Sequence, residues 1–284
     1  MRIERFPAGM GIAVVLLGVS CGAPDLQPKP VPDVVFPLVE TARVIVKGPL
    51  IPRLTAGPGG LLLAASTSGE LQALNPAAKS VAWTHQEGRS KTAPVVDGDK
   101  IFWAAEDGAK GKIVCLDPKG HVLWHRLIDE PAGGDLRVVG GKLVFQEGDK
   151  ALSALNAADG TPAWRDPASL PEEWTADGSR IVVRTADGRL RALDPEGRLV
   201  REIEVGENAA GPLGLFGNFV YFGYDDGRFG AIDLATGRKK WQMRLGGIPA
   251  GPPVSDGRVV LVALSNHVLA ALRAKRGDLL WWKP

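Results

Sequence analysis

The sequence predicts an all-β fold, a β-propeller of about six four-stranded blades with seven as the alternative count, on three observations. Tryptophans recur at a regular interval: Trp83, Trp124 and Trp164 lie 41 and 40 residues apart, and Trp241 and Trp281 lie 40 apart. A short apolar run precedes each tryptophan, and the turn-forming dipeptide Asp-Gly occurs seven times. Repeats of this length with four short strands are typical of propeller blades.

The turn before each tryptophan repeats as well. Its clearest copy reads Ala-Ile-Asp-Leu-Ala-Thr-Gly-Arg-Lys-Lys-Trp over residues 231–241. An Asp or Asn in this turn can bond its own backbone two residues on, and Gly accepts a positive φ at no steric cost. Between Trp164 and Trp241 one unit carries Arg201 in the tryptophan position, and the first unit lacks the glycine.

Each unit also contains a short continuous apolar run, which is typical of a strand buried on both faces. Helical repeats would show a period of about 3.6 residues, which these runs lack. The Trp-Asp pair of WD40 repeats is absent too, and Gly-His occurs only once, at Gly120-His121. The segment Thr41–Val46 reads as one more strand. We expect it to be added where the last blade meets the first and the ring closes.

The Ala-x-Asp-x-x-Thr-Gly-x-x-x-Trp pattern resembles the tryptophan-docking motif of the quinoprotein-type, or PQQ-like, propeller repeat family, over roughly residues 55–284. One unit matches fully and five match in part. The resemblance implies that each tryptophan docks on the next blade and that an N-terminal strand completes the last one. The residues that carry the expected docking role are Trp83, Trp124, Trp164, Trp241 and Trp281.

The N-terminal residues predict a targeting segment rather than a part of the fold. Two arginines precede an apolar stretch from Met10 to Val19, which is too short to span a bilayer. The following Ser20-Cys21 resembles a bacterial lipoprotein signal, in which the cysteine becomes lipid-modified; an ordinary secretory signal is the alternative. We therefore expect a signal peptide at 1–20, lipidation of Cys21, a proline-rich tether at 21–38 and the propeller at 39–284.

Composition excludes several classes of protein. The formal net charge is only +2, so a nucleic-acid-binding face is not supported. With Cys21 lipidated, Cys115 is the remaining thiol, and we expect it to be a small core residue because it replaces the alanine of the turn motif. The four histidines and the acidic pair Asp225-Asp226 read as surface and turn residues rather than metal ligands. We expect no metal and no cofactor.

An enzyme is the least favoured interpretation. A resemblance to the quinoprotein dehydrogenases would imply two adjacent cysteines beside the cofactor. This chain has no Cys-Cys pair. The pattern Gly-x-Ser-x-Gly occurs only at residues 18–22, across the end of the expected signal peptide, and His-Glu-x-x-His is absent, so no catalytic residue is assigned. Trp174 lies outside the repeat register on an irregular loop at 166–174, and is the candidate for a contact loop; local packing is the alternative.

The anchor, the tether and this repeat type together resemble the propeller lipoproteins of the outer-membrane β-barrel assembly machinery. The resemblance implies a non-enzymatic scaffold that binds protein partners in the cell envelope, is held to the outer membrane by its lipid and faces the periplasm. Outside such a complex we expect a monomer. Those lipoproteins have eight blades, more than this chain provides. The alternative is a sensor that binds a small ligand or carbohydrate in the central channel.

Overall fold

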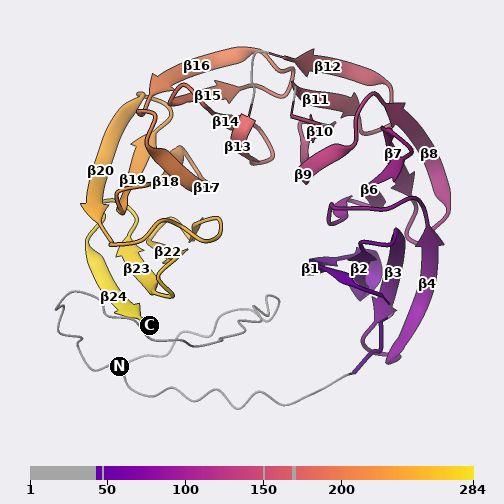
Figure 1. The fold of residues 1–284 in the computed structure, drawn as a ribbon. Helices are drawn as coiled ribbons and strands as arrows, with labels where there is room; N and C mark the ends of the chain where they lie inside the picture. The colour runs from indigo at the N-terminus through magenta and orange to yellow at the C-terminus, as the bar shows by residue number, and fades with distance from the viewer. Residues whose placement is uncertain (1–42, 47, 150, 168–170) are drawn as a thin grey trace.

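The structure, a computed structural model, describes residues 43–46, 48–149, 151–167 and 171–284. The expected signal peptide, Cys21, the tether and residues 39–42 lie outside the described residues. The described chain forms six antiparallel four-stranded sheets arranged around a centre, which is the predicted propeller (Figure 1). Apart from the short 3-10 turn η1 (Pro58–Gly60), its regular elements are strands, and no described helix has the length and apolarity to cross a membrane.

Each blade is built from four strands that are consecutive in the sequence, from the centre of the ring outwards. Blade 1 contains β1 (Leu50–Ala56), β2 (Leu62–Ser66), β3 (Glu70–Asn75) and β4 (Ser80–Gln86). Blade 2 contains β5 (Val95–Asp97), β6 (Lys100–Asp107), β7 (Lys110–Leu116) and β8 (Val122–Ile128). Blade 3 contains β9 (Ala132–Val139), β10 (Lys142–Glu147), β11 (Ala151–Asn156) and β12 (Pro162–Asp166).

The second half of the ring repeats the arrangement. Blade 4 contains β13 (Pro171–Ala176), β14 (Ile181–Thr185), β15 (Arg189–Leu193) and β16 (Leu199–Glu204). Blade 5 contains β17 (Ala209–Phe216), β18 (Phe219–Tyr224), β19 (Arg228–Asp233) and β20 (Arg238–Arg244). Blade 6 contains β21 (Val254–Ser255), β22 (Val259–Ala263), β23 (Leu269–Arg273) and β24 (Leu279–Lys283). The blade count is therefore six, as predicted.

The outer hairpin of every blade has the same register. In each, the small residue of the turn motif pairs with the tryptophan position, and the register shifts directly after it. The shift is one residue in every blade, so the difference in length between the turns is taken up within the turn itself and the tryptophan position keeps the same partner. The six pairs are Ala73–Trp83, Cys115–Trp124, Ala154–Trp164, Ala192–Arg201, Ala231–Trp241 and Ala271–Trp281.

The hydrophobic core consists of five clusters, and each fills the junction between two successive blades. One joins blades 1 and 2 around Leu71 and Trp103, for example, and another joins blades 5 and 6 around Phe229 and Val262. The other three join blades 2 and 3, 3 and 4, and 4 and 5. Burial between stacked sheets is the main source of stability in such a ring.

No buried cluster of described residues joins blade 6 to blade 1, and the ring is open there (Figure 1). The strand expected at Thr41–Val46 is not formed over its described part, Arg43–Val46, which has no regular structure. That prediction was wrong because blade 6 already takes all four strands from residues 254–283, which leaves no inner or outer place for a strand from the N-terminus.

Candidate functional site

Three tryptophans lie across the next blade in the way that the docking motif implies. The Trp83 indole donates a hydrogen bond from Nε1 to the carbonyl of Pro118 at 2.9 Å, and its ring lies over Gly120. Trp164 and Trp241 repeat this contact in blades 4 and 6. A Cβ on Gly120 would meet the ring at 2.7 Å, so a glycine is required at this point of each receiving turn.

The other blade junctions depart from this pattern. The Trp124 ring lies over Gly160, but its buried Nε1 has no hydrogen-bond partner in the described part of the chain. Arg201, in place of a tryptophan, lies beside Gly237 of blade 5. Trp281 is 37% exposed on the open side of blade 6. That each ring holds its junction together stays a prediction.

Trp174 is not on a contact loop. It lies within β13, is only 8% exposed and packs in the cluster between blades 3 and 4, against Val139 and Val144. The expectation of an exposed aromatic was wrong because the residues before Trp174 begin the inner strand of blade 4, which turns its side chain toward blade 3. Residues 168–170 of that loop lie outside the described residues.

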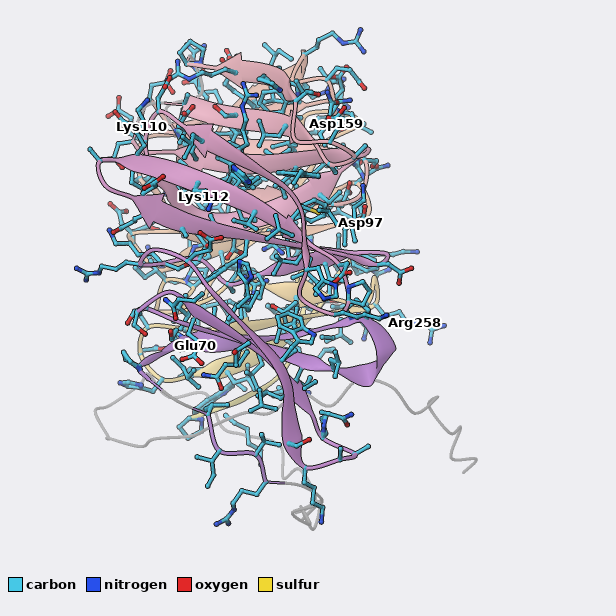
Figure 2. All side chains as sticks on the ribbon, turned by 90° about the vertical axis from the view of Figure 1, so that its right-hand side faces the viewer. Glu70, Asp97, Lys110, Lys112, Asp159 and Arg258 are labelled. Atoms are coloured by element: carbon cyan, nitrogen blue, oxygen red, sulfur yellow. The ribbon has the colours of Figure 1, made fainter. Side chains whose placement is uncertain are left out.

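The two faces of the ring differ in charge. The blade-to-blade connections and the turns between each blade's second and third strands lie on one side, here called the connection face; the remaining turns form the opposite turn face. In Figure 2, Lys110 marks the connection face, and Asp159 and Arg258 mark the turn face. Strand-end residues such as Lys110 left aside, the described turns and connections of this face carry two basic side chains, Arg89 and Lys91. They carry eight acidic ones: Glu87, Asp129, Glu130, Asp149, Asp187, Glu207, Asp225 and Asp226.

The turn face is nearly balanced. Its described turns carry eight acidic and seven basic residues. Many of these carboxylates are occupied by their own turns: Asp159 accepts hydrogen bonds from the backbone N–H and the hydroxyl of Thr161, which lower its pKa. On the connection face three of the eight carboxylates are likewise paired, Glu87 with Lys112, Asp187 with Arg189 and Asp226 with Arg228. The turns and connections of that face still carry more acidic than basic side chains, whereas those of the turn face are nearly balanced.

A pocket of about 500 Å³ opens on the connection face between blades 4 and 5. Three carboxylates line it, from Glu172, Glu207 and Asp225, together with Asn208 and Arg184. Arg184 is 6% exposed; it donates from Nη1 to the carbonyl of Gly211 at 2.6 Å, and its Nε lies 3.5 Å from Glu172. The carboxylates of Glu207 and Asp225 make no hydrogen bond or ion pair within the described chain, so they are free to receive a cation.

The inner strands carry a polar network toward the centre of the ring. Arg53 on β1 reaches across to Asp135 on β9 at 2.6 Å, and Arg137 contacts the other oxygen of that carboxylate at 2.7 Å. Burial raises the pKa of Glu173 on β13, a shift that the nearby Arg184 opposes. The ion pair joins the inner strands of blades 1 and 3, so charged side chains line the channel at this level.

Sequence reasoning found part of this site. Asp225 and Asp226 were singled out as turn acids, whereas Glu172, Arg184 and Glu207 were missed, because blade packing and not local spacing brings them together. No group of three or more metal-ligating side chains occurs in the part of the chain that the structure describes. Cys115 is fully buried in the cluster between blades 2 and 3, as expected of a small core residue.

The fold and repeat geometry agree with the comparison to known families. The family described as outer membrane protein assembly factor BamB matches residues 39–110 and 108–281. The chain belongs to this family. Its members named BamB include a protein of Yersinia pestis, 30% identical over 68% of this chain and 56% of its own length. Another, from Nitrosomonas eutropha, is 32% identical over 42% of this chain and 30% of its own length.

Two solved structures show the same fold. BamB from Moraxella catarrhalis superposes with a TM-score of 0.66 at 20% identity, covering 81% of this chain and 72% of that one. A quinohemoprotein alcohol dehydrogenase from Pseudomonas putida HK5 superposes with a TM-score of 0.61 at 14% identity, covering 79% of this chain and 57% of that one. Across the two curated BamB relatives, the chain spans from about a third to just over half of their length.

Proposed function

We propose that this protein is a non-enzymatic propeller scaffold that takes part in outer-membrane protein assembly by binding protein partners in the bacterial cell envelope. Membership of the BamB family supports the assembly role. The connection face supports the binding role, because two carboxylates without a described partner, Glu207 and Asp225, line a pocket on it between blades 4 and 5. Rigid scaffolds commonly present binding residues on such connecting segments.

The pocket indicates what kind of partner surface would bind. Glu207 and Asp225 carry negative charges that no described cation compensates, and Asn208 and the backbone of Ala209–Gly211 offer hydrogen-bonding groups beside them. A basic side chain on a partner loop would be attracted to the carboxylates, and the peptide groups of that loop would bond the pocket backbone. Such complementarity steers association and selects the partner.

The experiment is crosslinked recovery of complexes from intact envelopes. The double variant Glu207→Lys, Asp225→Lys reverses the charge of the pocket rim, and Asp99→Lys makes the same change at an exposed acid of the turn face. We expect the double variant to lose most of its outer-membrane assembly partners and the Asp99 variant to keep them. Recovery of no assembly subunit by the unaltered chain would contradict the proposed function. Unchanged recovery by the double variant would contradict the proposed surface.

The proposal includes an anchor at Cys21 in the outer membrane, with the ring facing the periplasm and monomeric outside its complex. The BamB relatives are named as outer membrane assembly factors, which supports this location. A sensor that binds a ligand in the central channel has no comparable support, because the family description and the curated relatives' names refer to assembly and to no ligand. No enzymatic step and no cofactor are proposed.

A further inference from the structure

The open side of blade 6 is an apolar sheet face, here called the seam face. The strand registers place Val254, Leu261, Ala271 and Trp281 side by side across all four strands. Val254 is 55% exposed and Trp281 37% exposed, whereas Ala271 between them is buried. The other face of the same sheet is covered by blade 5. Soluble monomeric proteins rarely leave a contiguous apolar face of this kind uncovered.

Blade 1 cannot receive Trp281 in the way that the other blades receive their tryptophans. Blades 2 to 6 have a glycine at the receiving position of the turn, and in blade 6 a Cβ on Gly277 would meet the Trp241 ring at 2.5 Å. In blade 1 that position is Lys79, which adopts a φ of 53° and carries a Cβ. The same obstacle applies to blade 1 of a second copy. A docked Trp281 therefore closes neither this ring nor a contact between two rings.

The blade 1 side of the seam is exposed in part, since Leu54, which pairs with Ala64 on that face, is 54% exposed. Ala64 and Gln72 pair with each other and point away from blade 2, because the neighbouring Leu63 and Ala73 belong to the cluster with that blade. Ala64 is nevertheless only 1% exposed and Gln72 only 2%. Both side chains lie in the middle of the sheet, and the chain that leads into blade 1 arrives from residue 43.

We propose that residues 31–42 of this same chain lie in the seam and cover the seam face of blade 6. This segment is rich in apolar side chains, with Val34, Phe36 and Leu38 at alternate positions. Pro37 lacks an amide hydrogen, so the segment is suited to packing over the face of a sheet rather than pairing at its edge. Twelve extended residues span about 40 Å, and packed sheets lie only about 10 Å apart, so the segment can reach blade 6 from Arg43.

Burial of residues 31–42 in the seam would leave 21–30 as the free tether below the lipid. The ring would then be held closer to the membrane than a tether over 21–38 allows. The seam would also be stabilised by apolar burial where the tryptophan contact is missing.

Photocrosslinking tests the occupant directly. The full mature chain carries p-benzoylphenylalanine in place of Trp281, and the crosslinked peptide is identified by mass spectrometry in a mixture of isotopically light and heavy protein. We expect crosslinks to residues 31–42 within one molecule. The control carries the same group in place of Val200, which is 66% exposed on the outer strand of blade 4, and should give no such product. Light–heavy products, crosslinks to another protein or no product at Trp281 would each overturn the proposal.

Hydrogen exchange gives a second measurement that leaves the ring unaltered. The variant Val34→Ser, Phe36→Ser, Leu38→Ser removes the apolar side chains from the segment. We expect deuterium uptake to rise several-fold in residues 254–263 and 279–283, with blades 2 to 5 unchanged. Equal uptake in the variant and the unaltered chain would overturn the proposal. Neither result depends on whether the connection face binds a partner, so this inference and the proposed function can fail separately.

Discussion

The indole of Trp241 lies flat against the backbone of Gly277 in the next blade, and its Nε1 donates a hydrogen bond to the carbonyl of Ala274 at 2.8 Å. Trp241 is 8% exposed and contacts the rings of Tyr221 and Phe229 at centroid distances of 6.1 and 5.8 Å. One side chain thus joins the aromatic core of blade 5 to the turn of blade 6. Its contribution depends on the absence of a side chain at Gly277.

Replacing Gly277 by alanine should therefore destabilise the protein. The added Cβ would meet the Trp241 ring at 2.5 Å, and the backbone φ of 77° is unfavourable for a residue with a side chain. Left-handed strain costs about 1–2 kcal/mol, and overpacking adds about 1–3 kcal/mol. Chemical denaturation followed by circular dichroism measures the decrease in the free energy of unfolding.

The matched control is Gly217→Ala. Gly217 also has a positive φ, 55°, but no atom lies within 4 Å of the Cβ that would be added. This variant should therefore lose only the part of the free energy of unfolding that comes from left-handed backbone strain, about 1–2 kcal/mol. Equal losses in the two variants would show that the contact between Trp241 and Gly277 contributes nothing beyond backbone geometry.

The buried Cys115 thiol should make stability decrease at alkaline pH. Burial raises its pKa from 9.0 to about 11, an effect that Lys100 slightly opposes. Because the unfolded thiol ionises first, the contribution is intact below pH 9 and is lost as the pH rises toward 11. A shift of this size corresponds to about 2–3 kcal/mol.

Urea denaturation at pH 8 and pH 10.5 tests this dependence, with Cys115→Ala as the comparison because alanine occupies the equivalent position in the other blades. We expect the free energy of unfolding to decrease less between the two pH values in the variant than in the unaltered protein. The same decline in both proteins would assign the effect to other groups.

The sequence predicted the ring because its signals are local. The turn motif and the tryptophan lie within eleven residues of each other, as in 231–241, and each copy folds into one outer hairpin. Even the unit without a tryptophan was placed correctly, since Arg201 pairs with Ala192 as the tryptophans pair with their alanines. Periodicity alone was therefore sufficient to count the blades.

Contacts between blades were beyond that reasoning. Glu172, Glu207 and Asp225 come from three different segments and share a pocket only because blades 4 and 5 stack. Trp174 was misassigned for a related reason, since its burial depends on the neighbouring blade and not on its own loop. The missing glycine of the first unit was visible in the sequence, but its meaning at Lys79 required the geometry of the other turns.

The anchor is tested by Cys21→Ala. If Cys21 carries the lipid, the variant should move from the membrane pellet to the soluble periplasmic fraction, because the described chain contains no helix able to hold it in a bilayer. Fractionation and immunoblotting measure the distribution, and a wash at high salt removes protein that is bound only by charge. A variant that remains in the salt-washed membranes would contradict the lipoprotein assignment.

Replacing Arg201 by tryptophan should stabilise the one junction in which an arginine replaces the docking indole. The receiving turn of blade 5 is already suited to a ring, because Gly237 has a φ of 73° and meets only the Arg201 side chain and Ile203. Leu234 occupies the position that provides the carbonyl acceptor in blade 6, three residues before the glycine. Burying the indole against Gly237 should raise the free energy of unfolding by about 1–2 kcal/mol.

The comparison is Arg201→Leu, which supplies apolar area without the flat ring or the indole N–H. Thermal and urea denaturation of both variants separate the two contributions. A gain confined to the tryptophan variant supports docking as the source of junction stability. If leucine stabilises equally, apolar burial alone accounts for the effect, and the tryptophans elsewhere in the ring should then tolerate replacement by leucine with little loss.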